Sequence, residues 1–92
     1  MTTYVMFGKY SAGSVEGMSA KRTDKAIECV KELGGEVKTM YSLLGQHDLL
    51  LITEFPSLEN VIKASVLLNK LTGIVFTTAP AISVKEFDRL MS

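Results

Sequence analysis

The stretch over residues 49–55, LLLITEF, constrains the fold more than any other part of the chain. It is short, rich in apolar side chains and followed by proline, which favours a β-strand. Successive side chains of a strand project to opposite faces, so Leu49 and Leu51 point one way. Leu50 and Ile52 point the other way. A strand that is apolar on both faces needs an apolar layer packed against each of them.

The first predicted strand repeats this pattern. Residues 3–10 are rich in the aromatic and β-branched side chains that are typical of strands. Tyr4 and Met6 fall on one side of this strand, and Val5 and Phe7 fall on the other. Two strands of the chain therefore present apolar side chains to both faces of a sheet.

The other elements follow at regular spacing. Apolar residues recur at helical spacing over residues 19–33, and Gly34 with Gly35 can supply a left-handed helix end. Ser57 is placed to cap a second helix, and Ser83 with Glu86 has the spacing of a capping box. We therefore expect strands over 3–10, 36–44, 49–55 and 74–82, helices over 19–33 and 58–71, a loop over 11–17, a turn over 45–48 and a short terminal helix from residue 83.

The order β-α-β-β-α-β with a short C-terminal helix predicts an α+β fold, the ferredoxin-like sandwich. Its four antiparallel strands carry both helices on one face, and the strands usually alternate apolar with polar residues because the other face is wet. The strands of this chain do not alternate in that way. We therefore expect the second face to be covered by another copy, pairing as a dimeric α/β barrel. The helix over 58–71 is apolar around most of its circumference, which indicates further assembly.

Two segments resemble a known family. The run RTDKAIECVKELGGEVKTMYSLLGQHDLLLITEFP has a helix ending in Gly-Gly, a strand with an aromatic residue, and a glycine-led turn ending in aspartate. Together with the tail TGIVFTTAPAISVKEFDRL, it is similar to the GYD-domain family of small bacterial and archaeal proteins. The resemblance implies a dimeric α/β-barrel fold and a function that is mostly unassigned. Gly45 and Asp48 match the family's turn, but His47 stands where a tyrosine is usual.

The turn over residues 45–48 holds the only histidine of the chain beside an aspartate. His47 and Asp48 are poorly placed for a catalytic dyad, because neighbouring strand residues project to opposite faces. We expect a structural turn instead, in which Gly45 adopts a positive φ and Asp48 accepts backbone N–H bonds. For His47 two interpretations stay open, an exposed loop residue or a ligand contact.

Five side chains are candidates for ligand binding: His47, Tyr41, Tyr10, Phe7 and Phe76. The aromatic ones could line a cavity between the sheet and the helices, or they could be ordinary core residues. The family often has an arginine at the position of Arg22. We expect this side chain to be a solvated helix-end charge or half of an ion pair.

Composition argues against several classes of function. Ten basic and ten acidic residues cancel without a run of either sign, so we expect no nucleic-acid partner. No apolar stretch approaches the ~20 residues that span a bilayer, and the amino terminus lacks the features of a signal peptide. One cysteine and one histidine are too few for a structural zinc site, and no helix carries a histidine for haem. We expect one cytoplasmic domain over residues 1–92, with no metal or cofactor.

Three functions remain. We favour a non-catalytic homo-oligomer that binds a small apolar or aromatic ligand, because no positioned acid, base or nucleophile can be named. The alternatives are a cofactor-independent oxygenase or isomerase, as other dimeric α/β barrels are, and a purely structural or regulatory oligomer. Convergent polar groups in a cavity favour the enzyme, an apolar cavity favours binding, and a packed interior favours the structural role.

Overall fold

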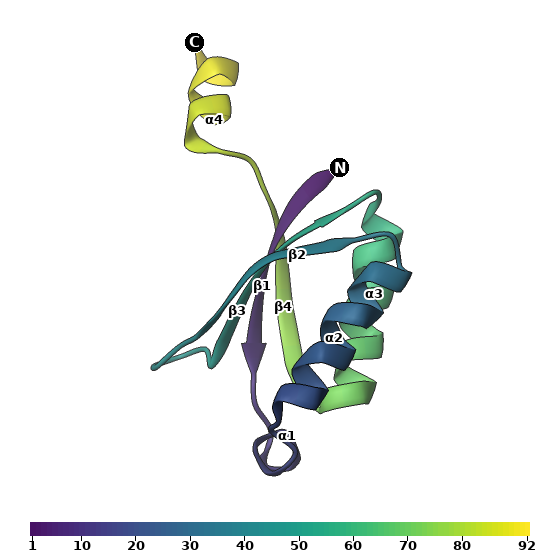
Figure 1. Ribbon diagram of the computed structural model, residues 1–92. Helices are drawn as coiled ribbons and strands as arrows, with labels where there is room; N and C mark the ends of the chain where they lie inside the picture. The colour runs from purple at the N-terminus through teal and green to yellow at the C-terminus, as the bar shows by residue number, and fades with distance from the viewer.

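The computed structural model covers residues 1–92 and contains one four-stranded sheet and four helices (Figure 1). The elements are β1 (Thr2–Lys9), α1 (Ala12–Glu16), α2 (Ala20–Glu32), β2 (Glu36–Ser42), β3 (Leu49–Phe55), α3 (Leu58–Thr72), β4 (Val75–Ala81) and α4 (Val84–Met91). The strands lie in the order β2-β3-β1-β4, and every neighbouring pair is antiparallel. The predicted α+β, ferredoxin-like arrangement is confirmed.

Short-range signals fix the ends of the two long helices. The side-chain oxygen of Ser57 accepts a hydrogen bond from the N–H of Asn60 and so caps the start of α3. Gly73 ends the same helix with a φ of 76°, and Gly34 follows α2 with a φ of 79°. Only glycine adopts this left-handed backbone without steric cost, so the chain turns back toward the sheet at both points.

Two local predictions differ from the structure. The predicted loop over 11–17 contains a short helix, α1. This helix begins with a reciprocal capping box between Ser11 and Ser14. At α4, Ser83 accepts the N–H of Glu86 as expected, but the other half of the predicted box does not form. The Glu86 carboxylate pairs instead with Arg89 one turn further on. An ion pair along the helix has replaced the second bond of the capping box.

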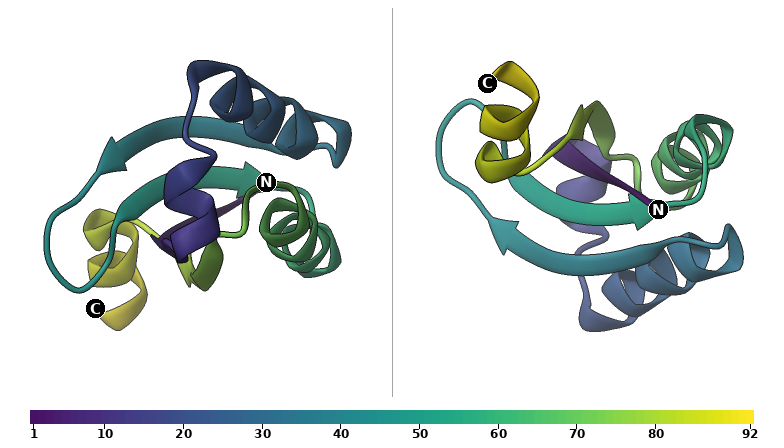
Figure 2. Two further views of the ribbon diagram at one scale, coloured as in Figure 1. Left: turned by 90° about the horizontal axis from the view of Figure 1, so that it is seen from below. Right: turned by 90° about the horizontal axis from the view of Figure 1, so that it is seen from above.

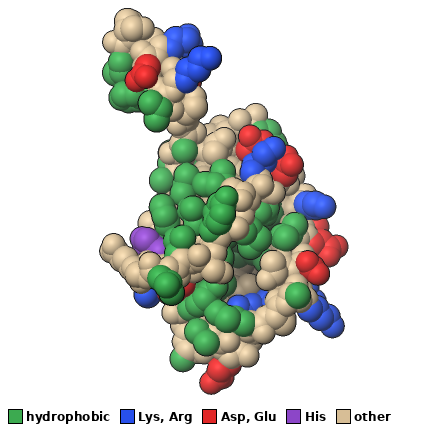
Figure 3. Space-filling view, turned by 60° about the vertical axis from the view of Figure 1, so that its left-hand side comes forward, with side chains coloured by type: hydrophobic (Ala, Val, Ile, Leu, Met, Phe, Trp, Pro, Cys, Tyr) green, Lys and Arg blue, Asp and Glu red, His purple; other side chains and the backbone are tan.

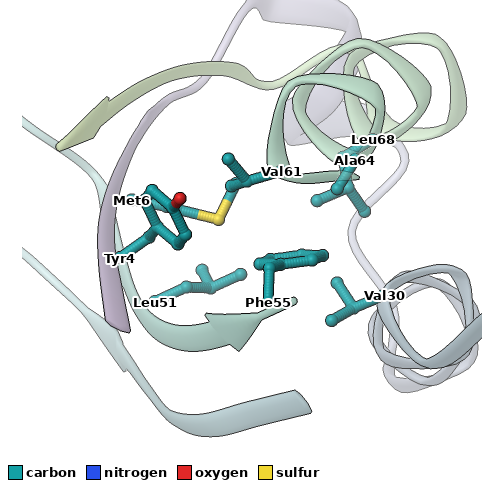
Figure 4. Close-up of a cluster of buried hydrophobic side chains, with 8 residues drawn as sticks. All are labelled: Tyr4, Met6, Val30, Leu51, Phe55, Val61, Ala64 and Leu68. Atoms are coloured by element: carbon teal, nitrogen blue, oxygen red, sulfur yellow. The ribbon is translucent and has the colours of Figure 1, made fainter. Parts of the chain in front are cut away.

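The core lies between one face of the sheet and helices α2 and α3, which both cover that face (Figure 2). Its buried side chains come from β1, β3 and both helices, and they point toward one another in Figure 4. They are Tyr4, Met6, Val30, Leu51, Phe55, Val61, Ala64 and Leu68. The rings of Tyr4 and Phe55 meet edge to face, with centroids 6.3 Å apart.

The other face of the sheet has no helix over it. In β1 and β3 buried residues alternate with half-buried ones, so the second apolar set points away from the helices. Val5 pairs with Ile52 and Phe7 with Leu50 at the centre of this face. Hydrophobic side chains gather over the sheet in Figure 3. We call this surface, with Val5, Phe7, Leu50, Ile52, Tyr41, Val75 and Ala79, the open face.

Helix α4 stands apart from the rest of the molecule (Figure 1). None of its residues is buried, although Val84, Phe87, Leu90 and Met91 are large and apolar. Their spacing places these side chains along one side of the helix. Helix α3 also leaves apolar side chains in water, among them Ile62 and Val66. No helix in the structure is both long and apolar enough to cross a lipid bilayer.

Candidate functional site: a pocket between the helices and the sheet

A pocket of about 220 Å³ opens between α2, α3 and the sheet. All four strands or their immediate ends contribute to it, together with both long helices. Its lining is mostly apolar: Tyr10, Arg22, Thr23, Ala26, Met40, Tyr41, Ser42, Leu49, Leu51, Leu68, Thr72, Ile74 and Phe76. Because Leu51 and Leu68 also belong to the buried core, the pocket is a continuation of the space between the two layers.

One glycine allows the wall near β4 to pack closely. Gly8 of β1 pairs with Phe76 of β4, and its position in the strand is one whose side chain would face the helices. A Cβ at Gly8 would lie 2.9 Å from the Ile74 side chain and 3.2 Å from the Phe76 ring. Real Cβ atoms essentially never come so close to a branched side chain, so a glycine is required for Ile74 and Phe76 to hold these positions.

Arg22 supplies the charge beside this apolar lining. Ser19 caps α2 by accepting the Arg22 N–H, which places the arginine in the first turn of the helix. Its guanidinium donates a hydrogen bond of 2.6 Å to the backbone carbonyl of Ser14 in α1. A Cβ at Gly17 would lie 2.9 Å from Arg22 Nη1, so glycine leaves room for the guanidinium there.

The expectation for Arg22 is therefore wrong in both of its forms. The side chain is half-buried against α1 and is not simply solvated. It forms no ion pair either, since the three ion pairs of the molecule join Lys9 to Asp48, Lys38 to Glu36, and Arg89 to Glu86. The sequence itself argues against an ion pair within the helix. No acidic residue stands three or four positions from Arg22, where a helical partner has to be.

The structure separates the five predicted ligand-binding residues into two groups. Tyr10, Tyr41 and Phe76 line the pocket. Phe7 and His47 lie away from it, and their rings contact each other with centroids 4.8 Å apart. Phe7 sits between two residues that face the helices, so it projects to the open face. His47 therefore extends the apolar surface of the open face and does not reach the pocket.

Asp48 ties the turn before β3 to the end of β1. Its carboxylate accepts the N–H of Tyr10 at 2.8 Å, and Lys9 Nζ lies 3.7 Å from the same oxygen. The Asp48 N–H donates to the carbonyl of Gly8 at 2.9 Å. Gly45 in the same turn has a φ of 123°. The carboxylate thus bonds a segment 38 residues away and not the turn's own backbone, and it positions Tyr10 at the pocket.

Other reactive side chains lie apart from the pocket. Cys29 is half-buried on α2, where burial and the nearby charge of Glu32 raise the pKa of its thiol. No group of three or more His, Cys, Asp or Glu side chains is close enough to hold a metal ion. The chemistry that the pocket offers is therefore an apolar space with hydroxyl groups and one guanidinium.

The fold and the pocket define a small ferredoxin-like α+β protein with a cavity between its layers. The sequence profile of the GYD domain matches residues 4–91, and the chain belongs to the GYD-domain family. The structure is similar to the leucine response regulatory protein LrpA of Mycobacterium tuberculosis, with a TM-score of 0.59 and 10% sequence identity. The likeness covers 89% of this chain and 51% of that one.

A solved structure of a mutant protein is similar to the same degree, with a TM-score of 0.60, 10% identity, and coverage of 90% of this chain and 51% of that one. At such identities the likeness shows the fold alone. The chain spans about half of the length of the solved structures that it matches. No curated protein matches it in sequence.

Proposed function

We propose that this protein is a non-catalytic, homo-oligomeric module that binds a small apolar or aromatic molecule in the pocket between the helices and the sheet. The observation that carries the proposal is the lining of the pocket. Nine of its 13 residues are hydrophobic, and they surround about 220 Å³. Mostly apolar pockets with a small number of placed polar groups are the usual sites for small organic ligands.

The polar groups of the pocket favour binding over catalysis. General bases are most often histidine or carboxylate side chains, and nucleophiles are often thiols. None of these lines the pocket, whose four polar residues are Arg22, Thr23, Ser42 and Thr72. Tyr10 and Tyr41, counted among the nine hydrophobic residues, add two phenol groups. Without an adjacent base to activate them, these hydroxyl groups are suited to orienting and holding a ligand, as is the guanidinium. A cofactor-independent oxygenase or isomerase is the weaker candidate for this reason.

A regulatory role is the second candidate. The M. tuberculosis protein with a similar fold is described as a leucine response regulatory protein. In a regulatory oligomer of this fold, the same pocket would hold the molecule that is sensed. The two candidates share the binding step and differ in what the bound state does to a partner.

We propose further that two copies pair through their open faces. Val5, Phe7, Leu50 and Ile52 form a contiguous apolar surface across β1 and β3, and soluble monomers rarely expose such patches. The pocket lies on the other side of the sheet. Apart from Tyr41, which the strand register places on the open face and which also borders the pocket, the ligand and the partner copy would therefore bind to different surfaces.

A cavity-filling substitution tests the binding proposal. Ala26 lines the pocket from α2, so Ala26→Phe should fill part of it and weaken binding of 3-phenylpropan-1-ol at least tenfold in isothermal titration calorimetry. Ala20→Phe is the matched control, because Ala20 is exposed on the same helix and lies outside the pocket. Equal binding by both variants and the wild type would show that the compound does not bind in the pocket. Native mass spectrometry of protein from its own host would report any retained molecule and the subunit count together.

A further inference from the structure

We infer that the natural ligand is a small organic acid, whose apolar body occupies the pocket and whose carboxylate is held by Arg22. This inference rests on the proposed function, because it names the chemical class of the ligand for the same site. It depends on a second hollow that adjoins the apolar pocket.

The second hollow has a volume of about 390 Å³ and begins where the pocket ends. It shares Arg22 and Thr72 with the pocket, so the two spaces meet at these side chains. Its lining is otherwise different in character: Gly13, Gly17, Ser19, Lys21, Lys25 and Leu71. The apolar pocket thus passes, at Arg22, into a polar hollow in which all three ionisable side chains are cationic.

These three cations have no acidic partner in the protein. Neither Lys21, Arg22 nor Lys25 has a carboxylate oxygen within 4.0 Å. Asp24 belongs to the same helix but lies on another side of it, where it lines a separate hollow with Lys31. Lys25 also borders a further hollow with Glu28 and Glu32, whereas Lys21 and Arg22 border no hollow that contains a carboxylate. The uncompensated positive charge therefore lies at Lys21 and Arg22, next to the pocket, and it favours a negatively charged ligand.

The guanidinium of Arg22 has donors to spare. It presents five N–H groups, and one hydrogen bond, to the carbonyl of Ser14, is made within the protein. That bond fixes the direction of the side chain and leaves the rest of its planar fork for a ligand. Two parallel N–H groups match the two oxygens of a carboxylate, whereas a lysine offers a point charge. Lys21 and Lys25 then add attraction at longer range.

The pocket behind Arg22 determines the size and the apolar character of the ligand's body. Ala26, Met40 and Phe76 present hydrocarbon and aromatic surface, and no acidic side chain lines the space to bind an amino group. A volume of about 220 Å³ accommodates a phenyl ring with a short chain or a medium-length alkyl chain. The geometry therefore fits a monocarboxylic acid with an aromatic or aliphatic body and disfavours a zwitterionic amino acid.

The test compares each acid with the alcohol of the same skeleton, on the 92-residue chain. Calorimetric titration with 3-phenylpropanoate and 3-phenylpropan-1-ol, and with hexanoate and hexan-1-ol, should give tighter binding of the acid by about tenfold or more. Arg22→Met should remove this preference and leave the affinity for the alcohol within about twofold, since the apolar contacts are unchanged. Lys63→Met is the control, because Lys63 is an exposed lysine of α3 outside both hollows.

A second variant tests the placement of the guanidinium without removing its charge. Gly17→Ala puts a methyl group 2.9 Å from the present position of Arg22 Nη1, so the guanidinium has to shift. Acid binding should weaken and alcohol binding should not. Acid and alcohol binding equally well in the wild type, with Arg22→Met unchanged, would overturn the inference and leave the proposed function standing. Failure of all four compounds to bind would overturn both.

Discussion

Asp48 connects the turn before β3 to the end of β1. It was expected to stiffen its own turn, but its carboxylate accepts the N–H of Tyr10, at the point where β1 ends. The backbone N–H of Asp48 donates to the carbonyl of Gly8, which lies two residues before Tyr10. Asp48 therefore holds the turn before β3 against the strand end that delivers Tyr10 to the pocket.

Removing this carboxylate should cost stability. Asp48→Ala leaves the Tyr10 N–H without its protein acceptor and should lower the free energy of unfolding by about 1 kcal/mol. For a domain of this size the melting temperature should fall by roughly 4–8 °C in a calorimetric scan. Asp48→Asn keeps an acceptor oxygen and should lose less. Equal losses in the two variants would assign the effect to the charge near Lys9 and not to the hydrogen bond.

Cys29 gives the molecule a predictable response to alkaline pH. Burial, and then the charge of Glu32, raise the pKa of the thiol in the folded state above its ordinary value of 9.0. The unfolded chain therefore loses this proton first as the pH rises, and the stabilising contribution that is present below pH 9 is lost between the unfolded and the folded pKa.

Urea unfolding of the wild type and Cys29→Ala at pH 7 and pH 10 checks this effect. The wild type should lose more stability than the variant over that interval, because only the wild type has the thiol. The thiol should also react with iodoacetamide more slowly in the folded protein than in urea at the same pH. A folded rate equal to the unfolded rate would contradict the direction of the pKa shift.

At the scale of the elements, sequence features that act over a few residues predict the structure correctly. The cap at Ser57, the left-handed residues Gly34 and Gly73, and the doubly apolar pattern of β3 all act within a few residues. They predicted the order of strands and helices, and hence the fold. The short helix α1 was missed because Gly13 inside it and Gly17 after it are typical of a loop, whereas the paired serines at its start outweigh them.

The candidate site was harder to predict because it depends on contacts between distant segments. Tyr10 and Phe76 could be named as aromatic candidates. Alternation places Phe7 opposite Tyr4 and Met6 but does not show which of the two sides faces the helices and the pocket. The sequence does not indicate a binding role for Arg22, because helix-end arginines are usually solvated. Its contact with Ser14 depends on how the chain turns between α1 and the first turn of α2, and no local sequence pattern predicts that turn.

Helix α4 is the one helix of the fold that buries none of its residues against the rest of the chain. Its apolar side chains have no layer to pack against in the monomer. We predict that this side of α4 packs on a second copy. Phe87→Glu should then weaken self-association at least tenfold in sedimentation equilibrium and leave the monomer folded by circular dichroism. Ser92→Glu adds the same charge just past the helix end and should leave association unchanged.

At the scale of the whole molecule, the two sides of the sheet are unequal. One side is filled by α2 and α3 and contains the pocket, whereas the open face presents apolar side chains without a covering layer. Burial of apolar surface contributes about 25 cal/mol per Å², so covering several hundred Å² on each copy is worth enough to offset the cost of association. The molecule's own asymmetry thus favours pairing through the open face.

A single charge at the centre of the open face tests this pairing. Ile52 lies between Val5 of β1 and Thr39 of β2, so Ile52→Lys places an ammonium in the middle of the surface without touching the core side of β3. Light scattering at micromolar concentration should give at least twice the chain mass for the wild type and a lower mass for Ile52→Lys. Glu59→Lys, on the exposed side of α3, should keep the wild-type mass. A wild type that is monomeric, or an Ile52→Lys variant that assembles like the wild type, would show that the open face is not the contact between copies.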